Sequence, residues 1–567
     1  MGTYAVQDTP EGTKTLIFTR DREIRLHSAY GPVREASRSV QSFSVGRANL
    51  IVVLGCGLGY HVTLLRERFP ECDLLVVERD REVVDLCDTH NPSSLAGAIV
   101  VTTPRDLSGY IESLDMARFH GARFYTHRPS YLIDAEFYDA AMRDINQYLS
   151  SKLSDLLTRF EFEARWVENI LCNLRHLERA HAVHDLFGAF SGIPGVIVSA
   201  GPSLRKNVGH LAALRSRALI IAVDTAYPVL RRLGIEPHIV MTLDSQKHSL
   251  KHFLGHEDSA AALVADIVSY PRILDRYRGP LIMSSTAKYY QDAGGGMNRE
   301  TTPFMDWVES HIEPFGDIQS GGSIATNAFD LLLNAGCAPI ILVGQDLAYT
   351  GREIHCSGTH HNDGWLPITN RMRNLETINQ SVVRRRTIKY VDACGAPTTV
   401  LTDFVFDLYR NWFSDSAAKV PCTVINATEG GARIENTVET PLRQLVDDIP
   451  IPATAPADIL TRILSRPSGR DLTRLRRALA AARETVQAIH DLSNGHVDST
   501  DPLIADRIET LADDPMVRQM FAPFLKKTRS YLMRHGELEA SKSRELILAD
   551  IATAAKKLLA FISRSKL

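Results

Sequence analysis

The stretch VIVSAGPSLRKNVGHLAALRSRALIIAVDTA, residues 196–226, decides the fold. It begins with a short apolar run, passes through a Gly-Pro-Ser turn into a helical pattern, and returns to a second apolar run that ends at Asp224. Two buried strands joined by a helix lie parallel in one sheet. The stretch therefore predicts an α/β domain whose ligands bind beyond the carboxyl ends of the strands.

The same alternation of apolar runs and helical patterns continues through residues 191–440. Further strands are expected at Ile239–Leu243, Leu263–Asp266, Leu281–Ser284, Ile340–Val343, Ile388–Val391 and Thr423–Ile425. Helical patterns separate several of these runs, so we expect a doubly wound, mostly parallel sheet with helices on both faces.

A different α/β unit is expected in residues 1–130. The apolar run 50–54 ends in GCGLG (55–59), an amphipathic pattern follows, and a second apolar run ends on Glu78. This order is typical of a Rossmann-like unit. The G-x-G-x-G spacing resembles that of class I methyltransferases, in which Glu78 would hold a ribose. The alternative is that the glycines only permit a tight turn and close packing.

Two helical regions flank the central domain. Residues 131–190 read as a helical connector, with helices expected over Asp134–Leu157 and Glu161–Phe187. Residues 441–567 start with a proline-rich linker at 450–456 and continue in helical patterns with almost no strand signal. They predict a C-terminal α-helical bundle suited to packing or to docking a partner.

Composition narrows the functional classes. Lysine and arginine number 64 against 67 acidic residues, a net charge of −3 over 567 residues, so we expect no nucleic-acid partner. No apolar stretch approaches the roughly 18 residues of a membrane span, and no signal peptide is visible. The eight cysteines include no C-x-x-C pair, which argues against a zinc site. We expect a cytoplasmic protein, and nothing in the sequence specifies an oligomer.

Polar residues follow the strands of the central domain, where a ligand is expected. Gly201, Pro202 and Ser203 form a turn suited to an anion such as phosphate. The pairs Asp224-Thr225 and Asp244-Ser245 follow the next two strands and could hydrogen-bond a ribose, a base or sugar hydroxyls. An aspartate in this position is otherwise often only a helix cap.

Three later segments add further candidates. Gly321, Gly322, Ser323, Thr326 and Asn327 lie at a helix start and suggest a second phosphate cradle. Asp346 and Tyr349 follow the strand at 340–343, and Asn426 and Glu429 follow the last strand. The loop holding His355, His360 and His361 could close as a lid. These histidines favour acid–base chemistry over a metal site, which would need several ligands to converge from one loop.

Together these segments resemble the motility accessory factor (Maf) glycosyltransferases. The resemblance rests on GPSL (201–204), VDTAYP (223–228), MTLDSQ (241–246), GGSIATNA (321–328), GQDLAYTG (344–351) and NATEGGARI (426–434). It implies transfer of a nonulosonic acid, of the pseudaminic or legionaminic type, from a CMP-activated donor to serine or threonine hydroxyls of flagellin, a step required for flagellum assembly and motility. The central domain is also similar to bacterial sialyltransferases, which have asparagines where this chain has Asp224 and Asp244.

The resemblance implies a role for each candidate. The glycine turns and the hydroxyl and amide residues beside them would bind CMP, Asp224 and Asp244 would orient ribose or sugar hydroxyls, and Tyr349 would donate to the departing phosphate. The base would be His355, His360 or His361. No D-x-D pair occurs at either strand end, and a monophosphate donor needs less charge neutralisation, so no metal cofactor is expected.

Two alternatives remain open. The central domain also resembles the archaeal 6-hydroxymethylpterin pyrophosphokinases, which would use ATP and Mg²⁺ held by Asp224, Asp244 or Asp346, with Arg205 and Lys206 near the phosphates. A non-catalytic flagellin-binding protein is the second alternative, because the helical tail is suited to docking a partner.

Overall fold

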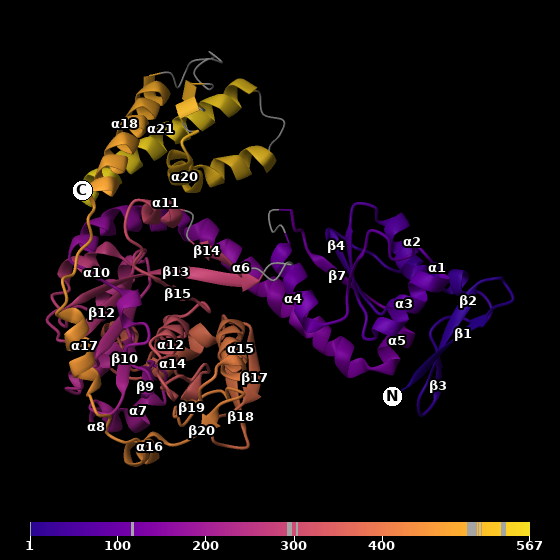
Figure 1. The fold of residues 1–567 in the computed structure, drawn as a ribbon, viewed down its shortest axis with the longest axis horizontal. Coiled ribbons are helices and arrows are strands. Elements are labelled where there is room, and N and C mark those ends of the chain that lie inside the picture. Colours follow the sequence, from indigo (N-terminus) through magenta and orange to yellow (C-terminus); the bar gives the residue numbers. More distant parts are fainter. Residues whose placement is uncertain are drawn as a thin grey trace. The chain divides into compact units, whose positions relative to one another are not determined.

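The computed structural model describes residues 2–114, 118–291, 297–301, 304–495, 507–508, 510–511, 513–534 and 540–567. The chain forms two compact units (Figure 1). One is built on Met1–Arg159 and the other on Phe160–Tyr290 and Met297–Leu567.

The first unit is the Rossmann-like unit expected from the sequence. Its four parallel strands lie in the order β6-β5-β4-β7. They are β4 (Leu50–Leu54), β5 (Asp73–Val77), β6 (Ile99–Val101) and β7 (Ala122–Thr126). The helices are α1 (Pro32–Gln41), α2 (Tyr60–Arg68), α3 (Arg81–His90), α4 (Pro104–Ser113) and α5 (Arg128–Ile133). An antiparallel sheet not predicted from the sequence precedes them, with strands β1 (Thr3–Asp8), β2 (Lys14–Thr19) and β3 (Glu23–Arg25).

The glycine loop after β4 packs against the unit's own side chains. A Cβ atom on Gly57 would lie 2.5 Å from His27 Nε2. Glu78 is buried and accepts hydrogen bonds from the Cys56 N–H at 2.8 Å and the Tyr138 hydroxyl at 3.0 Å. The carboxylate that would hold a ribose is thus engaged by the protein itself, and the geometry favours the interpretation that the glycines permit close packing.

The connector is one helix, not two. α6 (Ala135–Asn173) runs unbroken for 39 residues, because the sequence offers no glycine or proline at the expected break. The helix expected over Glu161–Phe187 is wrong beyond Asn173, where β8 (His181–Ala182) lies between two short 3₁₀ turns. The Asn173 side chain ends the helix by donating to the carbonyls of Ile267 and Ser269, both at 2.8 Å.

The second unit contains the predicted doubly wound sheet, in the order β14-β13-β12-β11-β10-β9-β16-β19-β20, with β15 and β8 also paired to β13. Its strands are β9 (Gly195–Val198), β10 (Leu219–Val223), β11 (Ile239–Thr242), β12 (Ala262–Asp266), β13 (Leu281–Gln291), β14 (Met297–Thr301), β15 (Asp317–Gln319), β16 (Ile340–Val343), β19 (Val424–Asn426) and β20 (Val438–Glu439). Strands β9 to β13, β16, β19 and β20 pair in parallel.

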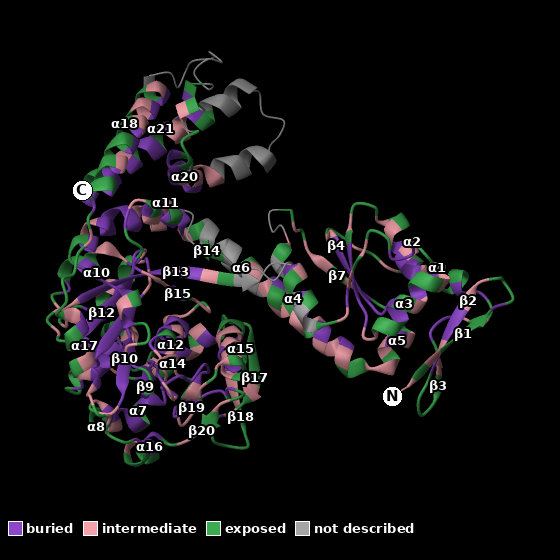
Figure 2. Cartoon of the chain, viewed as in Figure 1, coloured by how far each residue is buried: buried purple, intermediate pink, exposed green. Residues whose placement is uncertain are grey.

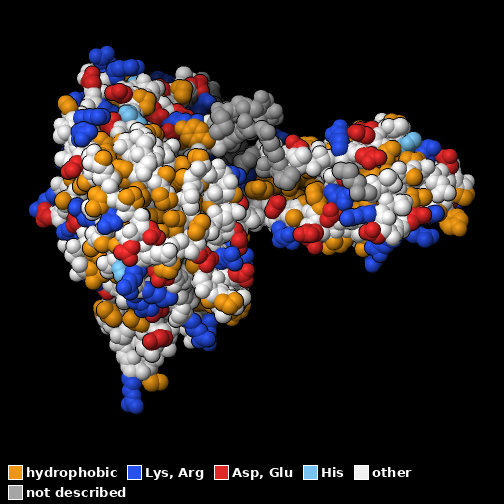
Figure 3. Space-filling model, turned by 60° about the horizontal axis from the view of Figure 1, so that its bottom comes forward, with side chains coloured by type: hydrophobic (Ala, Val, Ile, Leu, Met, Phe, Trp, Pro, Cys, Tyr) orange, Lys and Arg blue, Asp and Glu red, His pale blue; other side chains and the backbone are white. Residues whose placement is uncertain are grey.

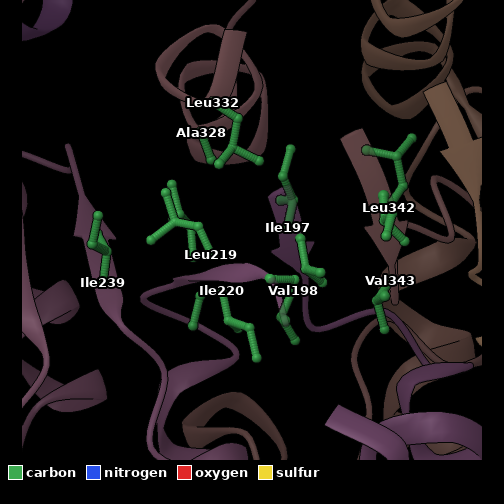
Figure 4. Packing of buried hydrophobic residues seen from close by; sticks show 14 of the residues in the cluster. Ile197, Val198, Leu219, Ile220, Ile239, Ala328, Leu332, Leu342 and Val343 are labelled. Carbon is green, nitrogen blue, oxygen red and sulfur yellow. The ribbon is translucent and has the colours of Figure 1, made fainter. Parts of the chain in front are cut away.

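Helices cover this sheet. They are α7 (Leu204–Asn207), α8 (Leu211–Leu214), α9 (Tyr227–Arg232), α10 (Pro271–Arg276), α11 (Met305–Ser310), α12 (Ile324–Asn334), α13 (His360–Trp365), α14 (Leu375–Val383), α15 (Phe404–Lys419) and α16 (Leu442–Asp448). Figure 4 shows Ile197, Leu219 and Leu342 pointing toward Leu332 of α12, while Val198, Ile220 and Val343 point to the opposite face. Both faces are therefore buried, as expected of strands that are continuously apolar.

The strand order reverses next to β9. From β9 the chain builds β10, β11, β12 and β13 outward on one side, whereas β16, β19 and β20 lie on the other side. Open α/β sheets bind ligands at such a reversal, beyond the carboxyl ends of the strands. The turn after β9 and the loop after β16 meet at this point.

One expected strand lies outside the main sheet. β17 (Ile388–Asp392) pairs antiparallel with β18 (Thr399–Asp403), so the expectation that residues 388–391 extend the parallel sheet is wrong. Tyr390 is 71% exposed in this hairpin, which leaves the strand without the two buried faces of a central strand.

The C-terminal region is helical, as predicted. It contains α17 (Pro456–Leu464), α18 (Thr473–Gly495), α20 (Pro515–Arg534) and α21 (Ala540–Ser565), and the expected helix at 502–511 falls mostly outside the described residues. Buried residues concentrate in the sheet strands and exposed ones on the outer helices and loops (Figure 2). Basic and acidic side chains are interspersed on the face shown in Figure 3. Within the described ranges, none of the helices has the length and apolarity that crossing a bilayer requires.

Candidate functional site

Asp346 organises the point where the strand order reverses. It follows β16 and accepts three donors: the Ser203 hydroxyl at 2.5 Å, the Ser203 N–H at 3.2 Å and the Thr350 hydroxyl at 2.6 Å. Burial raises the pKa of this carboxyl, while the hydrogen bonds from Ser203 and Thr350 and the charge of Lys206 oppose the rise. The predicted turn and the predicted aspartate thus form one hydrogen-bonded unit.

Two glycines make room for Asp346. A Cβ atom on Gly201 would lie 2.1 Å from Asp346 Oδ1. Gly431 has φ +76°, and a Cβ atom there would lie 2.3 Å from the Asp346 carbonyl oxygen. Since both donors of Ser203 are directed at Asp346, the turn of Gly201, Pro202 and Ser203 holds this carboxylate in place. Its predicted role in binding phosphate stays a prediction.

The two strand-end aspartates after β10 and β11 lie close together, as expected. Asp224 is buried and accepts a hydrogen bond from the Thr242 hydroxyl at 2.9 Å. Burial raises the pKa of Asp224 to about 7, and the nearby charge of Asp244 contributes, while the Thr242 and Thr225 bonds oppose. Asp224 is therefore poised between its neutral and charged forms near neutral pH.

Asp244 has a histidine partner that the sequence analysis missed. His248 Nε2 lies 3.1 Å from Asp244 Oδ2, and its side chain is 47% exposed. His248 belongs to a 3₁₀ turn, Lys247–His252, that directly follows the strand-end loop. The signal was present as an aspartate and a histidine four residues apart, where the loop after β11 leads into the turn. Ser245 is buried beside this pair, and its carbonyl accepts from Asn169 at 3.0 Å.

The three predicted histidines gather with His252 in what we call the histidine cluster (His252, His355, His360 and His361). Ring centroids are 4.9 Å apart for His355 and His361, 5.7 Å for His252 and His361, and 6.2 Å for His252 and His360. The His355 ring bonds to the carbonyl of Ala200, so the loop lies over the turn after β9.

Burial lowers the pKa of every member of the histidine cluster. The pKa of His355 falls to about 4, first because the ring is buried and second because His361 is near. Those of His252, His360 and His361 are lowered by burial and by neighbouring cations. Among the described residues, a carboxylate lies within 4 Å of His248, whereas none lies that close to any member of the histidine cluster.

The geometry of these side chains does not form a metal centre. Across the described part of the chain, no group of three or more His, Cys, Asp and Glu side chains is arranged to hold a metal ion. The rings of His355 and His361 stack face to face at 26°, so their nitrogens do not converge on one point.

The glycine-rich segment before α12 forms a compact cap. Ser323 accepts from the Thr326 N–H at 3.3 Å, and the Thr326 hydroxyl accepts from the Gly321 N–H at 2.9 Å. A Cβ atom on Gly321 would lie 2.5 Å from the ring of Trp412, and Gly322 has φ +98°. The glycines therefore bring the loop against α15.

Asn327 is the unusual residue of this segment. Its side chain is fully buried in the first turn of α12, yet within the described ranges neither Oδ1 nor Nδ2 has a hydrogen-bond partner. Buried amides are nearly always paired, and the N-terminus of a helix attracts anions. The amide thus has hydrogen-bonding capacity that the described residues leave unused.

The remaining candidates have partners within the protein. The Tyr349 hydroxyl donates to Asp403 Oδ2 at 2.6 Å, and burial together with this carboxylate raises its pKa. Asn426 is buried and accepts from the Thr428 N–H at 3.1 Å. Glu429 has φ +58°, and its carboxylate accepts from the Asn207 amide at 3.2 Å. These contacts tie the loops around Asp346 together.

Comparison with known proteins finds a family model that is similar to part of the second unit. Residues 168–352 match the family model described as 6-hydroxymethylpterin diphosphokinase MptE-like. The match covers the end of α6 and the sheet from β8 to β16, and so includes Asp224, Asp244 and Asp346.

The fold of the whole chain is similar to that of the Maf glycosyltransferase from Magnetospirillum magneticum AMB-1. The TM-score is 0.56 with 14% sequence identity, over 99% of this chain and 92% of that chain. The resemblance to Maf and MptE-like proteins expected from the sequence is confirmed in the fold and in the family model.

Curated relatives add sequence similarity but no activity. Two uncharacterized proteins of Treponema pallidum (strain Nichols) are 25% identical over 278 residues and 24% identical over 226 residues. The matches cover 47% and 37% of this chain, and 48% and 57% of the relatives. The chain thus spans about half the length of the curated relatives it matches.

Proposed function

We propose that this protein is a glycosyltransferase that moves a nonulosonic acid from a CMP-activated donor to serine or threonine hydroxyls of flagellin. The observation that carries the proposal is the Asp244–His248 pair beside Asp224, at the carboxyl edge of the sheet. A carboxylate-held histidine next to hydrogen-bonding carboxyls supplies a base and a means of orienting a sugar. The fold shared with the Maf glycosyltransferase supports the assignment.

His248 is the proposed base, in place of the three histidines singled out from the sequence. With the Nε2 proton directed at Asp244, Nδ1 can accept the proton of the acceptor hydroxyl. The hydroxyl oxygen then bonds to the anomeric carbon, the bond from that carbon to the phosphate oxygen breaks, and CMP leaves with the electron pair. Asp244 stabilises the imidazolium that forms. Within the described residues, no member of the histidine cluster has a carboxylate within 4 Å, so we propose that the cluster lines the site and does not act as the base.

The start of α12 is the proposed position of the donor's CMP group. The positive end of the helix suits a phosphate, and we propose that local opening of the first turn brings the buried, unpaired Asn327 amide to the ligand. Asp224, half protonated near neutral pH, can donate or accept a hydrogen bond from a ribose or sugar hydroxyl. A single phosphate carries less charge than a diphosphate, so we propose that no metal cofactor is needed.

The first experiment measures binding of CMP by isothermal titration calorimetry, with EDTA present, alongside ATP with Mg²⁺. We expect metal-independent CMP binding that weakens about tenfold or more in Asn327→Ala, which loses the hydrogen bonds to the ligand. Binding of ATP with Mg²⁺ and none of CMP would reject the transferase. It would instead support the pyrophosphokinase, which the family match over residues 168–352 favours as the second candidate.

The second experiment measures transfer itself, by intact mass of flagellin incubated with CMP-pseudaminic or CMP-legionaminic acid. We expect His248→Gln to bind CMP normally but to transfer roughly 10²–10⁴-fold more slowly. His184→Gln is the matched control, because His184 is 43% exposed and lies 3.5 Å from the neighbouring Asp185 in the same kind of turn. Equal transfer rates for the two variants would exclude His248 as the base. Binding of flagellin with no transfer by the wild type would leave a non-catalytic role.

A further inference from the structure

One cavity of the second unit shares no lining residue with the strand ends that carry Asp224 and Asp244. Its volume is about 660 Å³, and it is lined by Arg175, His176, Arg179, Asp275, Tyr277, Arg278 and Lys566. Arg175 lies in the 3₁₀ turn after α6 (Leu174–Glu178) and Arg179 directly follows it, Asp275 belongs to α10, and Lys566 follows α21. All of these elements belong to the second compact unit.

Positive charge dominates this cavity. Four cationic side chains line it against one carboxylate, Asp275. Burial lowers the pKa of His176, and Arg179 and Arg175 add to the effect, while the hydrogen bond between His176 and Asp275 opposes it. Its Nε2 lies 2.9 Å from Asp275 Oδ1, and Arg175 also pairs with that carboxylate. Asp275 is thus shared, while Arg278 pairs outside the cavity with the exposed Asp258 at 3.1 Å.

Two of the guanidinium groups retain donor capacity. Arg175 Nε is buried, and within the described residues it has no hydrogen-bond partner. Arg179 donates to the Leu274 carbonyl at 2.8 Å and to His176 Nδ1 at 3.4 Å, and no carboxylate of the described residues pairs with it. Burial and the neighbouring Arg175 lower the pKa of Arg179, because both disfavour its charge.

We infer that this cavity is a binding site for a phosphate-bearing small molecule, separate from the proposed transferase site. Arginine forks match the oxygens of phosphate in two parallel, charge-assisted hydrogen bonds. A phosphate dianion offsets the excess of cations and supplies acceptors to the exposed Arg179 guanidinium. The cleft is open to solvent, so the rest of a nucleotide or sugar phosphate can extend out of it.

The test is isothermal titration of the full chain with inorganic pyrophosphate, using the Asn327→Ala background to remove any binding at the start of α12. We expect one site that loses about tenfold affinity in Arg179→Gln and more in the Arg175→Gln, Arg179→Gln double variant. Arg81→Gln combined with Arg518→Gln is the matched control, because both arginines form exposed surface pairs with Asp85 and Asp513. The control should bind pyrophosphate as the parent does.

A second variant keeps the test independent of folding. Asp275→Asn removes the one carboxylate that lines the cavity among the described residues, so it should tighten pyrophosphate binding, a gain that misfolding does not produce. Titrations with CMP and with a sugar 1-phosphate then distinguish a nucleotide from a sugar phosphate. Equal heats of pyrophosphate binding in the double variant and in the control would overturn the inference. Loss of pyrophosphate binding at 150 mM salt in the parent and in every variant would overturn it as well.

Discussion

Gly201→Ala tests whether the close approach of Gly201 and Asp346 holds the site together. The new Cβ atom would lie 2.1 Å from Asp346 Oδ1 and 2.5 Å from the Gly344 carbonyl oxygen, well inside any real contact. Asp346 must therefore move away from Ser203 and Thr350. Each hydrogen bond to a charged group contributes about 1.5–3 kcal/mol, and partial relaxation keeps some of them. We expect a loss of about 3–5 kcal/mol in the free energy of unfolding.

Tryptophan fluorescence during urea unfolding isolates the relevant unit. All four tryptophans, Trp166, Trp307, Trp365 and Trp412, belong to the second compact unit, so their signal follows that unit alone. Gly209→Ala is the control, because nothing lies within 4 Å of the Cβ atom it adds. The control should change stability by less than about 1 kcal/mol, since glycine and alanine then differ mainly in chain entropy. A Gly201→Ala protein as stable as the control would refute the reasoning.

Three further predictions concern single side chains. Asp224→Asn should flatten the dependence of stability on pH. The folded pKa of Asp224, about 7, exceeds that of the unfolded chain, so ionisation of this carboxyl lowers stability as pH rises from about 4 to 7. Urea midpoints of the variant and the wild type at pH 5 and 8 measure this effect. Asn327→Leu should leave thermal stability unchanged or raised while CMP binding is lost, because its amide has no partner within the described residues. Ser203→Ala should cost about 1–3 kcal/mol in the same fluorescence assay, because Asp346 loses its hydroxyl donor, whereas an unchanged midpoint would contradict that bond.

The main sheet could be predicted because its strands carry a strong local signal. Runs such as Leu219–Val223 and Ile340–Val343 are apolar throughout, and a strand buried on both faces requires that pattern. The wrong predictions concern segments whose secondary structure is set by how they pack in the folded chain. The end of α6 depends on Asn173 reaching the carbonyls of Ile267 and Ser269, nearly a hundred residues away in sequence. The run at 388–391 includes the charged Lys389, so it lacks the continuous apolar pattern of a buried strand, and it forms a hairpin with 399–403.

The candidate site could be predicted only in part, and for the same reason. Aspartates at strand ends are visible in sequence, so Asp224 and Asp244 were found. His248 stands apart in sequence from the run of histidines at 355–361, which gives the stronger sequence signal. The number of histidines in a segment does not indicate which imidazole lies next to a carboxylate in the folded chain. The unpaired amide of Asn327 is likewise a property of the packed structure, since it depends on what surrounds the first turn of α12.

The contact among Gly201, Asp346 and Gly431 has a consequence for how this chain can change over generations. Gly201 and Asp346 are separated by 145 positions and Gly431 by 85 more, yet the three meet in the folded chain. A Cβ atom at position 201 would strike the Asp346 carboxylate and the Gly344 carbonyl oxygen, whereas one at position 431 would strike backbone atoms of residue 346, which every residue there carries. Loss of the aspartate therefore frees neither glycine to change, while the aspartate itself requires a glycine at 201, so the glycines should persist in relatives that have lost the carboxylate.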